Sequence, residues 1–148
     1  MAASNDYDPR YLAGILLFNA QDYFEAHEVW EDLWAASAQP ERRFYQGLIQ
    51  AAVALFHFGN GNVRGAARLF RSGQEYMRPS FPRFLGLDAE GFWGQMAACF
   101  GPVASSAEPP ADARPDPTQI PSITLDPAPD HWPDPSEFLP DEEARQRP

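Results

Sequence analysis

The sequence has 148 residues, of which 44% are apolar and 20 are aromatic, so a single domain can bury a core without disulfide or metal staples. Its formal net charge is −10, which makes it a poor generic nucleic-acid binder, because neutralising phosphates takes clustered lysines and arginines. With Cys99 as the single cysteine, no signal peptide in residues 1–9 and no membrane-length apolar run, we expect a cytoplasmic protein without disulfides or membrane spans.

The first 101 residues predict five helices, each with a recognisable start or stop. Asp8 caps the first helix and Pro9 stands at its favoured first position, while Asp22 and Asp88 are the expected caps of the second and fifth helices. No alternation of apolar and polar residues indicates a sheet. The predicted helices cover residues 9–19, 23–36, 40–58, 63–78 and 88–100.

The third predicted helix determines the expected architecture. From Phe44 to Phe58 it has no charged residue, and apolar side chains occupy nearly its whole circumference at about 100° per residue. A helix that is apolar all round is buried on all sides. We therefore predict an all-α fold, a multihelical bundle of about five helices around a buried central helix.

The composition changes after Gly101. Residues 102–148 hold 12 of the 16 prolines and 10 acidic residues against three arginines, whereas residues 1–101 form the helical domain with a net charge of −3. Proline fixes φ and lacks an N–H donor, so we expect an acidic, proline-rich tail that is extended or disordered and contributes little to folding. Two apolar patches, residues 120–125 and 132–139, are apolar enough to lie on the domain surface.

The predicted second helix carries a polar cluster at the edge of its apolar face. His27 projects just inside that edge and Glu31 lies one turn further on, so both side chains are expected to be partly buried. Glu28 points to the opposite, polar side of the helix. It reaches the cluster only if another element covers that flank.

The predicted third helix carries Gln46, Gln50 and His57 in one stripe, within about 40° of each other. Buried polar groups need partners, since each unpaired one costs about 1–3 kcal/mol. A short loop makes the second and third helices antiparallel, which places Gln50 beside His27 and Gln46 beside Glu31. His57 then lies about 10 Å away along the helix axis.

These residues allow two interpretations. In the first, His27 and Glu31 bind a divalent metal ion such as zinc, manganese or iron, with Glu28 and His57 as further candidates, and a metal-bound water serves hydrolysis. In the second, His27 and Glu31 hydrogen-bond the two glutamines in a structural network that fixes the pairing of the helices. The network is preferred, because buried polar groups are ordinarily satisfied by each other.

The predicted fourth helix presents Arg64, Arg68 and Arg71 on one stripe. This stripe could bind an anion or hold the acidic tail, but it also fits the solvated face of an amphipathic helix. The glycine-rich segment 59–62 lacks a phosphate-loop pattern. No nucleophile elbow, paired-cysteine site or dinucleotide fingerprint is present in the sequence.

The run from Phe18 to Trp34 resembles a bacterial and archaeal family known as domain of unknown function 309, as do the run from Phe44 to Gln50 and the pairs Gly61-Asn62 and Gly65-Ala66. The resemblance covers about residues 10–80 and implies a multihelical bundle with a buried central helix. That family has been labelled a predicted metal-dependent hydrolase. By this resemblance, the acidic-histidine motif of the family corresponds to His27, Glu28 and Glu31.

Three functions therefore compete at this level: a structural or interaction module with a buried polar network, a metal-dependent hydrolase with a His/Glu site, and an anion-binding module that uses the arginine face. Neither a membrane nor a nucleic acid is expected as a partner. The sequence leaves homo-oligomer formation open, and it specifies neither a substrate nor a metal.

Overall fold

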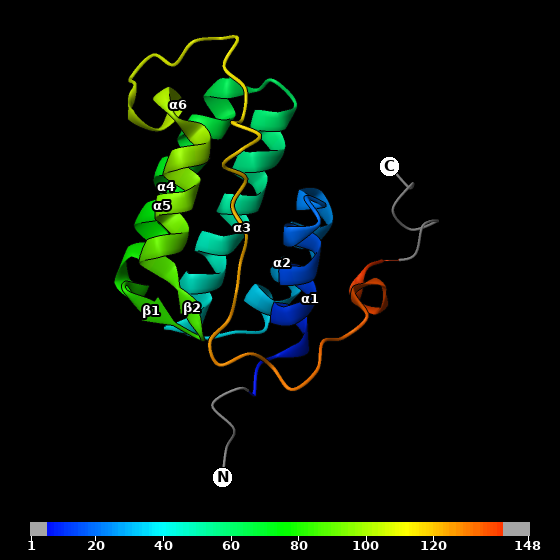
Figure 1. Ribbon diagram of the computed structural model, residues 1–148. Coiled ribbons are helices and arrows are strands. Elements are labelled where there is room, and N and C mark those ends of the chain that lie inside the picture. Colours follow the sequence, from blue (N-terminus) through cyan, green and yellow to red (C-terminus); the bar gives the residue numbers. More distant parts are fainter. Residues whose placement is uncertain (1–5, 141–148) are drawn as a thin grey trace.

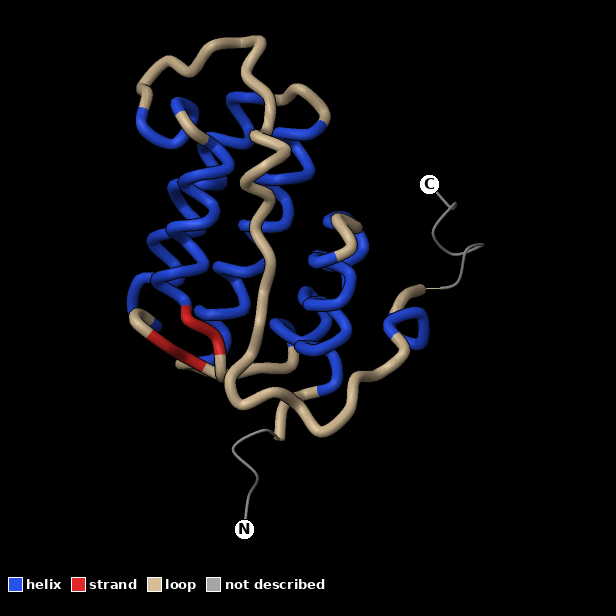
Figure 2. Tube along the Cα trace, viewed as in Figure 1, coloured by secondary structure: helices blue, strands red, loops and turns tan. Residues whose placement is uncertain are grey.

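The computed structural model describes residues 6–140, and most of the regular structure in this part of the chain is helical, as predicted (Figures 1 and 2). These residues contain six α-helices, five of them of seven residues or more, and one hairpin of two short strands. No helix among them is long and apolar enough to cross a membrane. In chain order the elements, with η for a 3-10 helix, are α1 (Pro9–Asn19), α2 (Tyr23–Ala35), α3 (Glu41–Gly59), α4 (Val63–Met77), η1 (Arg78–Ser80), β1 (Arg83–Phe84), β2 (Leu87–Asp88), α5 (Ala89–Phe100), α6 (Pro102–Ser105) and η2 (Pro135–Phe138).

The helix starts follow from local capping. The side chains of Asp8, Asn62 and Asp88 each accept a hydrogen bond from a backbone N–H two or three residues further on. This confirms Asp8 and Asp88 as the predicted caps of α1 and α5 and makes Asn62 the cap of α4. Asp22 occupies the cap position of α2, but its side chain makes no capping hydrogen bond. The predicted helix start is therefore correct there, while the predicted capping interaction is wrong.

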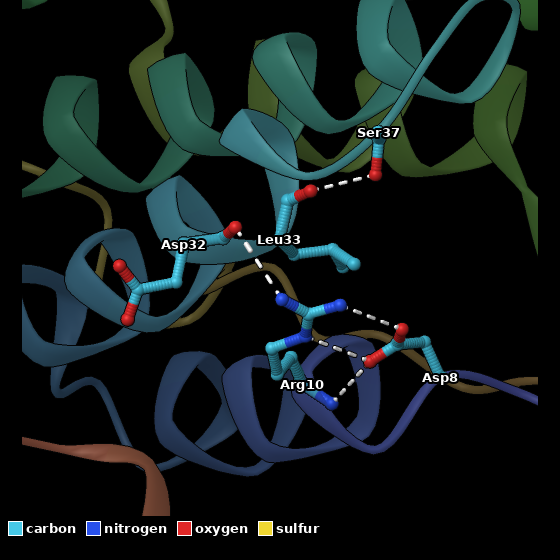
Figure 3. Close-up of polar contacts among 5 residues, drawn as sticks. All are labelled: Asp8, Arg10, Asp32, Leu33 and Ser37. Carbon is cyan, nitrogen blue, oxygen red and sulfur yellow. Dashed lines mark hydrogen bonds and ion pairs between the residues drawn. The ribbon is translucent and has the colours of Figure 1, made fainter.

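Asp8 also connects the start of α1 to the end of α2 through Arg10 (Figure 3). Its carboxylate accepts hydrogen bonds from the Arg10 backbone N–H at 2.8 Å and from the guanidinium Nε and Nη2 at 3.2 and 3.1 Å. The same guanidinium donates to the carbonyl of Asp32 at 3.5 Å. The hydrogen bond to Asp8 raises the pKa of the Arg10 guanidinium, although partial burial opposes the shift.

We expect Asp8→Ala to lower the free energy of unfolding by about 1 kcal/mol, because it removes a helix cap together with a half-exposed ion pair. Urea unfolding followed by circular dichroism measures the loss. Asp22→Ala is the matched control, since that cap side chain makes no capping hydrogen bond, and its loss should be smaller. Equal losses for the two variants would show that the Asp8 hydrogen bonds contribute nothing.

The hairpin between α4 and α5 is a departure from the all-α prediction. β1 and β2 pair antiparallel in the register Arg83 with Asp88 and Phe84 with Leu87. The two residues between them, Leu85 and Gly86, have φ values of 46° and 77°, and positive φ at both central positions is the requirement of a type I′ turn. Strands of two residues are too short to show alternation in the sequence.

Helix α3 lies between α2 and α4 and packs most extensively against these two helices (Figure 1). Ten of its residues are buried, Phe44, Leu48 and Phe58 completely. One stripe of the helix faces outward: Gln46, Gln50, Val53 and His57 are half-buried, and Phe56 is exposed. Among the described residues α3 is therefore covered on most of its circumference but open along one side.

The tail packs against the helices over much of its length. The trace after α6 runs along the bundle, and hydrogen bonds place it between α1 and α5 (Figure 2). Asn19 of α1 both accepts from the Ile123 N–H at 2.8 Å and donates to the Ile123 carbonyl at 2.9 Å, while Gln95 of α5 accepts from the Ser122 N–H at 3.0 Å. Leu125 forms a β-bridge with Leu87.

Three tail side chains, Val103, Ile123 and Leu125, are only 0%, 3% and 4% exposed and belong to the hydrophobic core. This is a larger contribution to the core than the proline content of the tail predicts. Residues 141–148, the end of the predicted tail, lie outside the described residues.

Candidate functional site

His27 and Glu31 form the predicted pair on α2. The imidazole Nε2 lies 3.2 Å from the Glu31 Oε1, and Nδ1 lies 2.8 Å from the backbone carbonyl of Phe24. The His27 side chain is 18% exposed and that of Glu31 is 57% exposed. Both ring nitrogens therefore face oxygen atoms that can accept a hydrogen bond.

As a metal centre this pair is incomplete. A histidine that ligates a metal often donates its other N–H to a backbone carbonyl, as Nδ1 of His27 can do here. A catalytic zinc ion, however, ordinarily takes three protein ligands. Among residues 6–140, no group of three histidine, cysteine, aspartate or glutamate side chains could hold a metal ion. The described donors do not fit a three-ligand site, and metal binding by His27 and Glu31 stays a prediction.

The two other candidate ligands have different surroundings. Glu28, with Glu31, lines a shallow hollow between α2 and the η2 segment of the tail, so a second element does cover that flank. His57, near the end of α3, packs beside the ring of Phe56, with ring centroids 6.0 Å apart. It is half-buried on the open stripe of α3.

The glutamines were predicted to pair with α2. Gln50 instead accepts a hydrogen bond from the hydroxyl of Ser72, so it connects α3 to α4. Gln46 and Glu31 line one hollow, which brings them near each other as predicted, but its other walls come from α3, α4 and the segment before α3. Both glutamines are half-buried on the open side of α3, where water can satisfy them, and this removes the need for a closed network.

The arginine stripe of α4 faces the tail in part. Arg64, Arg68 and Arg71 are all exposed. Arg71 donates from Nη2 to the Ser106 carbonyl at 2.8 Å. Arg64 and Arg71 line a hollow of about 640 Å³ together with Glu108 of the tail, whereas Arg68 does not line it. This arrangement suits the alternative in which the stripe holds the acidic tail.

Two further features were not identified from the sequence. A hollow of about 340 Å³ lies over the start of α3; its lining residues are Glu31, Trp34, Gln39, Arg42, Arg43, Gln46, Ile49 and Tyr76. The adjacent arginines directly before the apolar run of α3, with a glutamine one turn on, are the sequence signal that could have indicated it.

The second feature is an aromatic patch, which we define as Phe24, His27, Phe56 and His57. Phe24 and Phe56 are 44% and 37% exposed, and their ring centroids lie 5.6 Å apart across α2 and α3. Phe24 also packs on the His27 ring, with centroids 5.1 Å apart. The patch therefore has an apolar centre with an imidazole on either side.

Buried reactive groups elsewhere in the described chain are poorly placed for catalysis. Burial raises the pKa of Tyr23 to about 12, and its hydroxyl has no hydrogen-bond partner in this part of the chain. Burial likewise raises the pKa of the Cys99 thiol. Both groups are therefore protonated at neutral pH, which makes neither of them a ready base or nucleophile.

Comparison with known proteins gives relatives without an assigned activity. Residues 11–69 match the family described as "Domain of unknown function (DUF309)". "Uncharacterized protein YpuF" of Bacillus subtilis (strain 168) is 42% identical over 65 residues, which are 43% of this chain and 37% of that protein. An "Uncharacterized protein" of Aquifex aeolicus (strain VF5) is 36% identical over 55 residues, which are 36% of this chain and 16% of that protein.

The matched parts thus cover less than two fifths of either relative. The segment that matches the family contains the His27–Glu31 pair, the aromatic patch and all of α3. The chain therefore carries a DUF309 domain and is homologous to these uncharacterised proteins.

Proposed function

We propose that this protein is an interaction module that binds an amphipathic helix of another protein on the open side of α2, α3 and α4. The observation that carries the proposal is the contact between two exposed phenylalanine rings, Phe24 and Phe56, on neighbouring helices. Exposed aromatic side chains that gather in one place are typical of protein-binding surfaces.

The surroundings of the rings support a helical partner. The open stripe of α3 runs the length of the helix and continues from Phe56 through the half-buried Val53 to Gln50 and Gln46. Its flanks are α2 and α4, which pack on either side of α3. An amphipathic helix laid along such a stripe places apolar residues against the rings and polar residues against the glutamines.

The net charge of the chain favours binding of a different protein over binding of a second copy of this chain. Each copy has a formal net charge of −10, so two copies repel each other before any contact forms. The patch itself has no acidic residue, although Glu31 lies beside His27. A partner helix with a neutral or basic polar face meets no such repulsion.

A photo-crosslinking amino acid at residue 24 or 56, introduced in cells of the native organism, tests the contact. We expect the same discrete protein adduct from both positions and no such adduct from residue 132, since Trp132 is an exposed aromatic residue outside the patch. An adduct of twice the mass of this chain would identify a second copy and overturn the proposal. So would identical adducts from all three positions.

With the purified partner, Phe24→Ser and Phe56→Ser should each weaken binding at least about tenfold, because each removes roughly 1.5–3 kcal/mol of apolar burial. Isothermal titration calorimetry measures the dissociation constant. Both rings are exposed in the free protein, so the unfolding midpoint should change little. An unchanged dissociation constant in both variants would disprove the role of the patch.

A further inference from the structure

The hollow over the start of α3 has two arginines in its walls. Arg42 and Arg43 are in the first turn of α3, about 100° apart around the helix, so one side chain reaches toward α2 and the other toward α4. Gln46 lies one turn further on, between the two directions. The three side chains therefore converge on the same hollow from one short stretch of helix.

Both guanidinium groups are held in place by rings. The Cζ of Arg42 lies 3.8 Å from the centroid of the Trp34 ring, and the Cζ of Arg43 lies 5.2 Å from that of Tyr76. Each guanidinium also donates one hydrogen bond to a backbone carbonyl, at 3.4 Å for Arg42 and 3.2 Å for Arg43. A guanidinium has five N–H donors, so both groups keep donors for a ligand while their positions are fixed.

The charge of the two arginines is not compensated by carboxylates. Within residues 6–140, Arg10 and Arg78 form ion pairs with acidic side chains, but Arg42 and Arg43 form none. Stacking on aromatic rings orients these cations without neutralising them.

We propose that this hollow binds a small organic oxyanion, with a phosphate or carboxylate group held between Arg42 and Arg43 and hydrogen-bonded by Gln46. Planar guanidinium groups bind these anions in a bidentate manner, and the positive end of the α3 dipole adds to the attraction. The volume of about 340 Å³ is at the small end of ligand pockets. Glu31 on the same wall accepts a hydrogen bond from a hydroxyl or amino group of the ligand.

This site is separate from the aromatic patch. Phe56 follows Arg43 by 13 residues in α3, which corresponds to about 20 Å along the helix. The oxyanion site and the proposed partner helix meet only at Gln46, so variants of the arginines, which leave the aromatic patch unchanged, test the oxyanion site.

Titration of the full-length protein with inorganic phosphate, glycerol 3-phosphate and malate tests the site, with sodium chloride at equal ionic strength as the reference. Nuclear magnetic resonance follows the indole N–H of Trp34, which stacks on Arg42, and calorimetry measures the dissociation constants. We expect saturable binding of at least one probe with a shift at Trp34. Preference for the phosphates or for malate then identifies the anionic group. No saturable binding of any probe overturns the proposal.

The variants separate this site from general charge effects. Arg43→Gln should weaken binding about 10- to 100-fold, the effect of losing a charge-assisted hydrogen bond, and Arg43→Lys should weaken it less. Arg68→Gln is the matched control, because Arg68 is an exposed arginine of α4 outside this hollow. Equal weakening by Arg43→Gln and Arg68→Gln, at unchanged unfolding midpoints, overturns the proposal.

Discussion

Truncation after residue 101 should unfold the protein or remove most of its stability. The truncation takes Val103, Ile123 and Leu125 out of the core, and each buried aliphatic side chain contributes roughly 1.5–3 kcal/mol. Their combined contribution is comparable to the whole stability of a typical domain, about 5–15 kcal/mol. The truncation also exposes Leu87, which forms a β-bridge with Leu125. Urea unfolding followed by circular dichroism compares residues 1–101 with the full chain.

Two controls separate core contacts from chain length. A chain that ends at residue 129 keeps all three buried side chains, so its midpoint should lie much closer to that of the full chain. Ile123→Ser should be strongly destabilising, whereas Thr124→Ser should be nearly neutral, because residue 124 is exposed beside the buried residue 123. If residues 1–101 unfold cooperatively at the midpoint of the full chain, the tail has no part in the core.

The helices were predictable because their signals are local. Asp8, Asn62 and Asp88 bond to backbone groups within three residues, so the sequence alone places these helix starts. The hairpin at residues 83–88 depends on a two-residue turn with positive φ and on strands of only two residues. Neither feature produces a periodic pattern that could be read in advance.

The role of the tail was not predictable from composition. Ile123 pairs with Asn19, which is 104 residues away in the chain, and Leu125 pairs with Leu87. The apolar patch at residues 120–125 indicated a surface contact, but the identity of these partners depends on how the helices are placed relative to each other. Prolines restrict φ and remove donors, but an extended segment can still bury alternate side chains, as residues 121–125 do.

In the candidate sites, too, contacts that are local in the sequence were predictable and contacts between distant segments were not. The His27–Glu31 contact follows from the i, i+4 geometry of one helix, which is fixed by sequence spacing. The hydrogen bond between Gln50 and Ser72 and the hollow between Arg42 and Tyr76 need the relative placement of α3 and α4. The prediction rested on the second and third helices alone, packed antiparallel. It left out α4, the helix that supplies Ser72 and Tyr76.

The packing of α1 on α2 depends on a close approach at Gly14. The indole ring of Trp30, which is completely buried, lies against the backbone there and donates from Nε1 to the Tyr11 carbonyl at 3.2 Å. A Cβ atom at residue 14 would overlap this ring. Because the indole is rigid and enclosed, it cannot move aside without disturbing the aromatic residues around it, such as Phe18.

We therefore expect Gly14→Ala to lower the free energy of unfolding by about 3 kcal/mol or more, at the upper end of overpacking effects. Gly94→Ala in α5 is the matched control: nothing lies near its added Cβ, so the same substitution should stabilise by roughly 0.5–1 kcal/mol. In a Trp30→Phe background, where the ring is smaller, Gly14→Ala should cost clearly less. Equal costs in both backgrounds, measured by urea unfolding, would contradict the assigned overlap between residue 14 and the indole.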